Sequence, residues 1–219
     1  MLSNDILKFL KELKKNNNRE WFEKNKPRYV NAQNELKALI AEWIKLLAKT
    51  DPAVGHLDPA KCIFRIYRDV RFSADKSPYK VNLGAYLNTG GKNSDKAGYY
   101  LHVQPGNSFF GAGVYMPLPE NLPRIRQEID YNFASFKKIL NNKKFKANFP
   151  ELSDEMKLKK TPKGYDENNP AIEFLKLKSF VVFKKMKDEE VLSKDAVKKI
   201  TELSVIVHPF CSFLNEAMR

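Results

Sequence analysis

Residues 81–116 read VNLGAYLNTGGKNSDKAGYYLHVQPGNSFFGAGVYM, and this stretch decides the fold. Apolar residues alternate over 81–87, which predicts a strand with one face made of Val81, Leu83, Ala85 and Leu87. Aromatic and β-branched residues predict two further strands over 99–104 and 109–116, separated by the turn-forming residues 105–108. Because successive strands are joined by short connections, we expect an antiparallel meander.

Two glycines and a histidine of these strands bear on what can lie against the sheet. Gly111 and Gly113 leave space there for a neighbouring chain segment or a ligand. His102 shares strand parity with Tyr100, so both side chains can face a cleft. The chain has only three histidines and none lies in an HxH or HExxH spacing, so we predict no metal site.

Outside the meander the sequence predicts mostly helices. Residues 1–50 form a helical N-terminal part, 61–116 the β part, and 119–219 a mostly helical part with one further strand. The β part is expected to begin with a strand at 62–67, CIFRIY. We therefore predict a single α+β domain over 1–219, in which an antiparallel sheet of about four to six strands packs with N-terminal and C-terminal helices.

Two local signals mark expected helix ends. Asn17 and Glu20 resemble a capping box at the start of a helix that carries Trp21. Pro209 is expected to break the last helix, because proline lacks the backbone N–H and clashes with the preceding turn.

The composition is that of a globular chain with an excess of basic residues. The 219 residues have a formal net charge of +13, but 31 of the 39 basic residues are lysine, so compositional drift accounts for much of it. No apolar run approaches the ~18 residues of a membrane span, and charges interrupt the apolar pattern at the N-terminus, so we expect neither membrane association nor a signal peptide. Cys62 and Cys211 form no disulfide framework, and a cytoplasmic location is expected.

The arginines are more informative than the lysines, because three of the eight lie within seven residues. They belong to RIYRDVRFSADKSPYK, residues 65–80, which we call the basic loop. Proteins bind phosphate and carboxylate groups through arginine and lysine side chains, serine hydroxyls and backbone N–H groups. The predicted ligand-binding residues are Arg65, Arg68, Arg71, Ser73, Lys76, Ser77 and Lys80.

Other side chains would support this anion site. Asp69 can orient an arginine, and Asp75 can start an Asx-turn. Aromatic and polar residues from the loop and from the predicted helix start would form its walls: Tyr79, Arg19, Glu20 and Trp21. On an extended backbone Arg65 and Arg71 share one side and Arg68 takes the other, so the arginines converge only if the chain turns near Arg68.

Several functions remain open at this point. The first hypothesis is binding of a phosphate-bearing or other anionic small molecule; the second is an enzyme acting on such a substrate. Aromatic residues interleave with the basic loop, which is compatible with binding a nucleic-acid backbone. The last alternative is an interaction protein whose loop is only a salt-bridged hairpin. No Walker loop, GxGxxG or GxSxG is present, so no cofactor is predicted.

Four phrases resemble a known family: NNNREWF (16–22), RDVRFSADKSPYK (68–80), GAGVYMP (111–117) and PKGYDENNP (162–170). They are similar to those of the bacterial and fungal family called domain of unknown function 2461, over essentially the whole chain. The resemblance implies one full-length domain and no particular activity. The resemblance is concentrated at Arg, Asp, Lys, Ser and Tyr residues. It therefore implies that the basic loop is the functional segment of the family.

Overall fold

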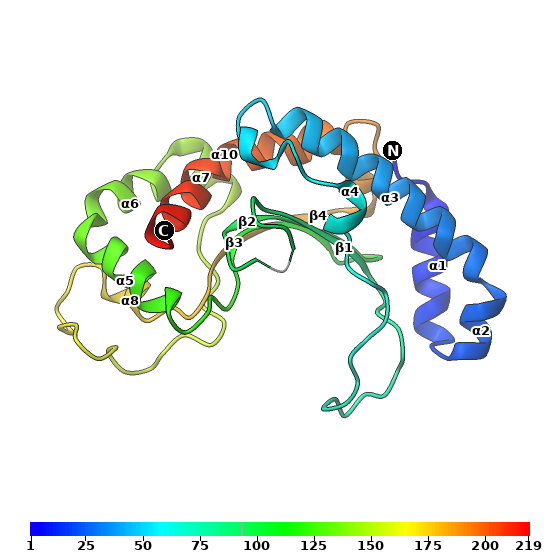
Figure 1. Cartoon of the computed structure of the whole chain (residues 1–219), viewed down its shortest axis with the longest axis horizontal. Helices are drawn as coiled ribbons and strands as arrows, with labels where there is room; N and C mark the ends of the chain where they lie inside the picture. Colours follow the sequence, from blue (N-terminus) through cyan, green and yellow to red (C-terminus); the bar gives the residue numbers. More distant parts are fainter. Residues whose placement is uncertain (93) are drawn as a thin grey trace.

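The computed structural model, which describes residues 1–92 and 94–219, has an α+β fold built on one four-stranded sheet (Figure 1). The strand order is β1-β2-β3-β4, and each neighbouring pair is antiparallel. The strands are β1 Leu83–Leu87, β2 Gly98–Val103, β3 Ser108–Val114 and β4 Phe180–Met186. The predicted α+β class and antiparallel meander are thus confirmed, with four strands. Asn93, in the connection from β1 to β2, lies outside the described residues.

Helices cover one face of the sheet and both of its ends. The helical elements are α1 Asn4–Lys15, α2 Arg19–Lys24, α3 Lys26–Leu47, η1 Pro52–Val54, α4 Pro59–Cys62, α5 Asn121–Tyr131, α6 Phe133–Leu140, α7 Lys143–Asn148, α8 Ile172–Leu175, α9 Asp188–Leu192 and α10 Ala196–Ala217. The long helices α3 and α10 cross the same face of the sheet, so the molecule forms an arch with the other face on its inside (Figure 1). Within the described chain, no helix combines the length and apolar character that a membrane crossing requires.

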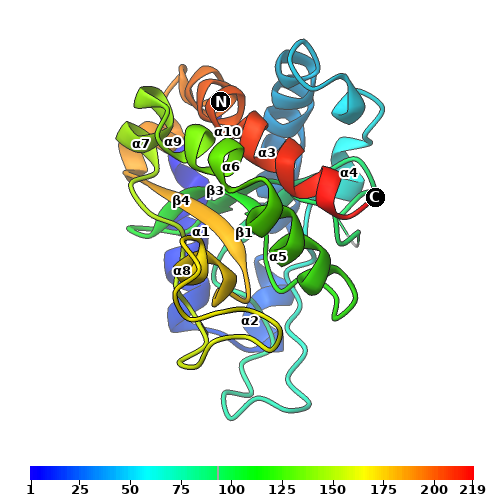
Figure 2. The ribbon, with the colours of Figure 1, turned by 90° about the vertical axis from the view of Figure 1, so that its left-hand side faces the viewer.

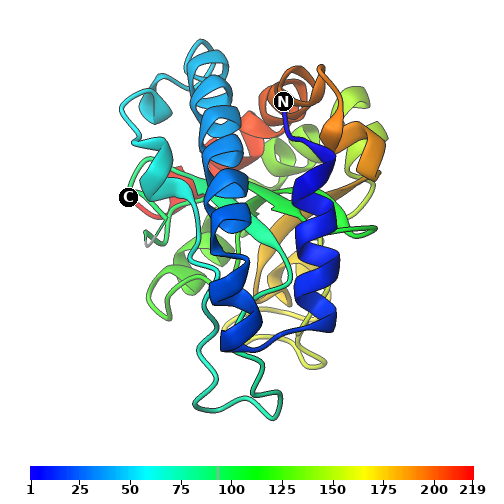
Figure 3. The same ribbon diagram turned by 90° about the vertical axis from the view of Figure 1, so that its right-hand side faces the viewer.

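The two ends of the arch have different structures. Figure 2 shows α5, α6 and α8 at one end, together with the long connection between α7 and α8. Figure 3 shows the other end, where α1 lies beside α3 and the basic loop extends below them. The inside of the arch, below the sheet, is therefore flanked by helices and a long connection on one side and by the basic loop on the other (Figure 1).

The core lies between the sheet and the two long helices. Alternate strand residues point into it, including Leu83, Ala85, Leu101 and Phe110, and all are almost completely buried. Trp43 of α3 packs against Phe110 with ring centroids 6.2 Å apart. The indole N–H of Trp43 donates to Ser204 Oγ of α10 over 3.0 Å, which joins the two helices inside the core.

The strand predicted at 62–67 is wrong. Cys62 ends α4, and the following residues make only isolated bridges, Ile63 to Ala85 and Tyr67 to Tyr79. Ile63 and Ile66 are buried, so the apolar pattern reflects burial against the edge of β1. After Phe64 N–H donates to Gly84 O, the chain leaves the sheet edge and enters the basic loop, so no continuous ladder forms.

Two predicted helix ends are also wrong. Pro209 lies inside α10, which continues to Ala217. The carbonyl left without a donor belongs to Val205, four residues earlier, whose side chain is on the exposed side of the helix. The residue that caps α2 is Asn18, which accepts from Trp21 N–H, whereas Asn17 bonds to the basic loop.

The link between Trp43 and Ser204 gives a test of the core. The Ser204→Ala variant leaves a buried indole N–H without an acceptor, so the free energy of unfolding should fall by about 1–3 kcal/mol. Urea denaturation measures the change. Ser212→Ala on the same helix is the control, because Ser212 is partly exposed and its contact to His208 is 3.4 Å long. Equal stabilities for the two variants would contradict this role of Ser204.

Candidate functional site

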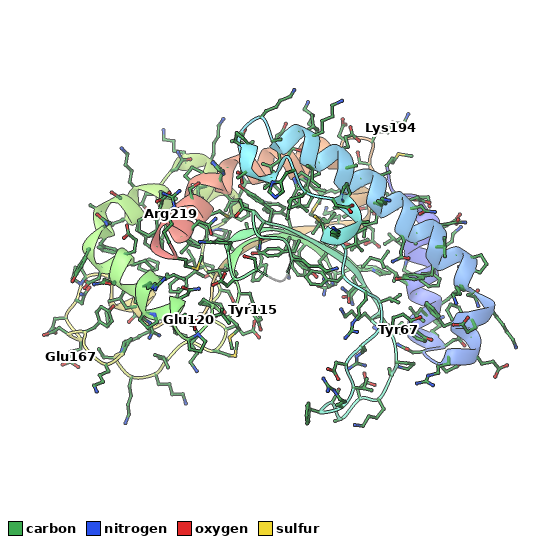
Figure 4. The ribbon with its side chains drawn as sticks, in the orientation of Figure 1. Tyr67, Tyr115, Glu120, Glu167, Lys194 and Arg219 are labelled. Carbon is green, nitrogen blue, oxygen red and sulfur yellow. The ribbon has the colours of Figure 1, made fainter. Side chains whose placement is uncertain are left out.

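A cleft of about 860 Å³ lies under the uncovered face of the sheet. Alternate residues of all four strands make its floor, among them Gly84, Tyr86, Tyr100, His102, Phe109, Gly111 and Phe183. Figure 4 places Tyr115, just beyond β3, and Tyr67, in the basic loop, on opposite sides of the hollow below the sheet. Tyr115 lines the cleft, together with Met116 and Pro117. The face that was expected to leave room for a neighbour or a ligand is therefore the floor of a cleft.

The ring of His102 is held in the floor by three polar contacts, the longest of which joins its Nδ1 to Asn82 Nδ2 over 3.4 Å. Its Nδ1 is 3.0 Å from Tyr100 Oη and its Nε2 is 2.9 Å from Gln104 Oε1. A neutral ring with its proton on Nε2 satisfies both, because it donates to Gln104 and accepts from Tyr100. Burial lowers the pKa of His102, and burial also raises the pKa of Tyr100 to about 12. Both groups are therefore uncharged at neutral pH.

Three cationic side chains gather at the edge of the cleft beside the basic loop: Arg65, Lys80 and Lys92. Burial lowers the pKa of Lys80, and the positive charges of Arg65 and Lys92 lower it further. The Lys80 ammonium lies 5.6 Å from the centre of the Phe64 ring, and Lys92 donates to Ile63 O over 2.7 Å. Among the described residues, the Arg65 side chain has no hydrogen-bond or carboxylate partner. The cleft therefore combines an apolar floor with a positive edge.

The rest of the basic loop is held mainly by its own side chains. Arg71 binds both carboxylate oxygens of Asp69, at 3.0 and 2.7 Å. Arg68 pairs with Asp75 and also approaches Ser73 Oγ at 3.3 Å. Lys76 donates to the Val70 carbonyl over 2.9 Å. These contacts leave Arg71, Ser73 and Lys76 outside the cleft.

The base of the loop is attached to the helices at its end of the arch. Asn17 Nδ2 donates to Tyr79 O and Tyr79 N–H donates back to Asn17 Oδ1, at 2.9 and 3.1 Å. The Tyr79 ring stacks on Phe22 of α2 with centroids 4.0 Å apart. Backbone bonds from Arg68 to Pro78 and from Lys80 to Ile66 close the base. Lys80 is thereby fixed at the edge of the cleft.

Apart from Arg71, Ser73 and Lys76, which line neither cavity, the predicted site residues fall into three groups. Four line the cleft: Arg65, Arg68, Asp69 and Lys80. Asp75, Ser77 and Tyr79 line a smaller cavity of about 350 Å³, which Arg68 and Lys80 share. On α2, Arg19 and Glu20 are exposed, and Trp21 stacks on Phe9, so these three line neither cavity. The turn expected near Arg68 does bring Arg65 and Arg68 to one side, whereas Arg71 turns away to Asp69.

Several lining residues were not among the predicted ligand contacts. The sequence does indicate His102 and Tyr100, because alternation along the strand places both side chains on one face of the sheet, which is also the face of the β3 glycines. Phe183 carried none, since its strand is almost continuously apolar. Lys92 is one lysine of a polar connection, and only the fold brings it to Lys80. Within the described chain, no three His, Cys, Asp or Glu side chains form a group that could hold a metal ion.

The comparisons with known proteins give one result. A family model described as a conserved hypothetical protein (DUF2461) matches residues 5–213, nearly the whole chain. No curated protein and no solved structure matches significantly.

The carboxylate that organises the basic loop gives a pH prediction. Asp75 accepts from the Ser77 hydroxyl and backbone N–H and from Arg68, which together lower its pKa to about 2. A carbon-detected NMR titration should therefore place its midpoint near 2, below the ~3.9 of a free aspartate. Because the folded pKa is below the unfolded one, these contacts order the loop above about pH 4 and are lost as the pH falls through 2.

Ser77→Ala is the matched variant for this titration, since it removes the hydroxyl and keeps Arg68. The midpoint of Asp75 should then rise. An ordinary aspartate midpoint in the unsubstituted protein would show that the loop is not organised in this way.

Proposed function

We propose that this chain, which belongs to the DUF2461 family of conserved hypothetical proteins, binds a small anionic ligand in the cleft under the sheet. The observation that carries the proposal is the convergence of Arg65, Lys80 and Lys92 at one edge of a cleft with an aromatic floor. A phosphate or a carboxylate is the group that such an edge would hold.

The size and position of the cleft support a small molecule as the occupant. Its volume of about 860 Å³ is within the 300–1,000 Å³ typical of ligand pockets. Sheet faces with many apolar residues are normally covered by another layer of the protein, and here the helices leave this one uncovered. In a mostly apolar pocket, a small number of polar groups fixes the orientation of the ligand.

Electrostatics supports an anion. Three positive charges beside one another raise the free energy of the empty cleft, and burial adds a desolvation cost at Lys80. A bound anion would relieve both effects. The Asp69 carboxylate also lines the cleft and interacts with the charge of Arg65, but its two oxygens are bonded to Arg71, which lowers its pKa more than Arg65 does.

The geometry narrows the set of contacts expected from the sequence. Arg65 and Lys80 are the residues of the basic loop that we assign to the anion, with Lys92 added. Arg68 lines the cleft but pairs with Asp75, so we assign it to holding the loop. Ser73, Ser77 and Lys76 bond within the loop, and none of them supports the proposal.

Catalysis in the same cleft is the second candidate, and His102 favours it. A neutral imidazole in a ligand pocket can take up a proton, and its contacts to Tyr100 and Gln104 fix its orientation. A cytoplasmic location is part of the proposal. Cys62 and Cys211 are buried free thiols, which is usual in a reducing compartment.

The experiment is isothermal calorimetry with inorganic phosphate, sugar phosphates, nucleotides, aryl phosphates and aryl carboxylates. The double variant Arg65→Ala, Lys80→Ala should weaken the binding of a hit by at least about tenfold, as expected for loss of charge-assisted hydrogen bonds. Arg71→Ala, which removes a basic-loop arginine outside the cleft, should leave the affinity within about twofold.

Salt separates this proposal from binding to a nucleic-acid backbone. Affinity for short RNA that falls steeply with salt, and that Arg71→Ala reduces as much as the double variant, would point to the exposed tip of the loop. Equal effects of the two variants on every small anion, or no binding by any of them, would overturn the proposal.

A further inference from the structure

Three glycines line the cleft, and an aromatic ring of the floor reaches over two of them, Gly84 and Gly111. A Cβ added at Gly84 would lie 2.7 Å from Tyr100 Oη and 3.1 Å from its ring. A Cβ added at Gly111 would lie 3.1 and 3.2 Å from two ring atoms of Phe183. Strand side chains ordinarily stand away from the sheet. Here the missing side chains let Tyr100 and Phe183 extend sideways over a neighbouring strand.

The register explains this arrangement. Gly111 of β3 is directly opposite Phe183 of β4. Gly84 of β1 is opposite His102, so it is the diagonal neighbour of Tyr100 on β2. Each ring therefore fills the space above a glycine on the next strand, a packing known to compensate for glycine in sheets.

The other aromatic groups extend this surface. The rings of His102 and Phe109 are parallel, with centroids 4.6 Å apart and an interplanar angle of 13°. Phe109 meets Phe183 edge to face at 5.4 Å. Phe183, on the edge strand β4, is 42% exposed, and its exposed side is in the cleft. The floor is thus a low, broad aromatic surface.

The aromatic floor is continuous with the positive edge. Phe64 lies 6.1 Å from Tyr100 and carries the Lys80 ammonium over its own ring. The tyrosine hydroxyls of the floor are already used inside the protein, since Tyr86 bonds to two carbonyls and Tyr100 bonds to His102. The floor therefore offers ring surface, and the charged groups are at one side.

We propose that the ligand of this cleft is a planar unsaturated ring that carries a phosphate or carboxylate. The inference rests on the proposed function and specifies its ligand class. The ring stacks on the surface formed by Tyr100 and Phe183, and the anionic group reaches Arg65 and Lys80. Stacking between flat ring systems favours an aromatic body over a saturated body of similar volume.

The test compares two probes of similar size, phenyl phosphate and cyclohexyl phosphate, at a pH well above the second pKa of both phosphates, so that both are dianions and the ring is the main difference. Calorimetry should give an affinity about tenfold or more higher for phenyl phosphate, within the range measured for stacking on one aromatic side chain. Equal affinities for the two would overturn the planar ring and leave the anion site intact. Binding of neither would overturn the inference, while inorganic phosphate and the charge variants still decide the proposed function.

Variants separate stacking from simple apolar contact. Phe183→Leu keeps an apolar side chain and removes the ring, so the preference for phenyl phosphate should fall toward unity. Tyr100→Phe removes only a hydroxyl and should retain the preference. Phe72→Leu is the matched control, because Phe72 is 97% exposed in the basic loop and lies outside the cleft. A preference that survives in Phe183→Leu, with an unchanged melting temperature, would contradict stacking on this ring.

Discussion

Alternation along β2 assigns neighbouring residues to opposite environments, and the core and the cleft both depend on it. Tyr99 points into the covered side, where its hydroxyl contacts Asp51 at 2.9 Å and His208 at 2.8 Å and links the sheet to α10. Tyr100 points into the cleft. A shift of one residue in register would exchange the two sets, because the side-chain period of a strand is two. The packing of α3 and α10 on one face therefore also fixes which side chains line the cleft.

The basic loop is a different kind of structure, since few of its residues are buried. Its base is fixed by the stacking of Tyr79 on Phe22 and by the paired bonds with Asn17, whereas its exposed end is held by ion pairs between exposed groups. Exposed ion pairs contribute little to stability, so they determine local conformation more than the free energy of folding. The consequence for the site is that the backbone at the base, which carries Arg65 and Lys80, is held in place beside the cleft.

The sequence predicted most of the fold because the strands of the meander have distinct patterns. The alternation of 81–87 and the turn at 105–108 specify pairing between neighbours, and the structure has both. The failures have physical causes. Residues 62–67 are apolar because they pack on a sheet edge, and α10 accommodates Pro209 where the lost bond affects an exposed turn. For the site, the clustering of arginines in the sequence drew attention to the basic loop. Which of these arginines pairs with a carboxylate depends on the three-dimensional path of the chain.

Some basic side chains are already paired with carboxylates of the protein. The number of basic residues therefore does not indicate which of them could bind an anionic ligand. Arg71 and Arg65 are equivalent in the sequence, with the same residue type, loop and strand parity. In the folded chain Arg71 holds a carboxylate in water, where ligand binding would have to displace an existing partner. Arg65 is also exposed, but it stands beside the partly buried Lys80 and Lys92 at the edge of the cleft, where an anion would replace repulsion by attraction. Under the proposed function, only a small part of the +13 charge would take part in recognition, and it is the part that has no carboxylate in an ion pair among the described residues.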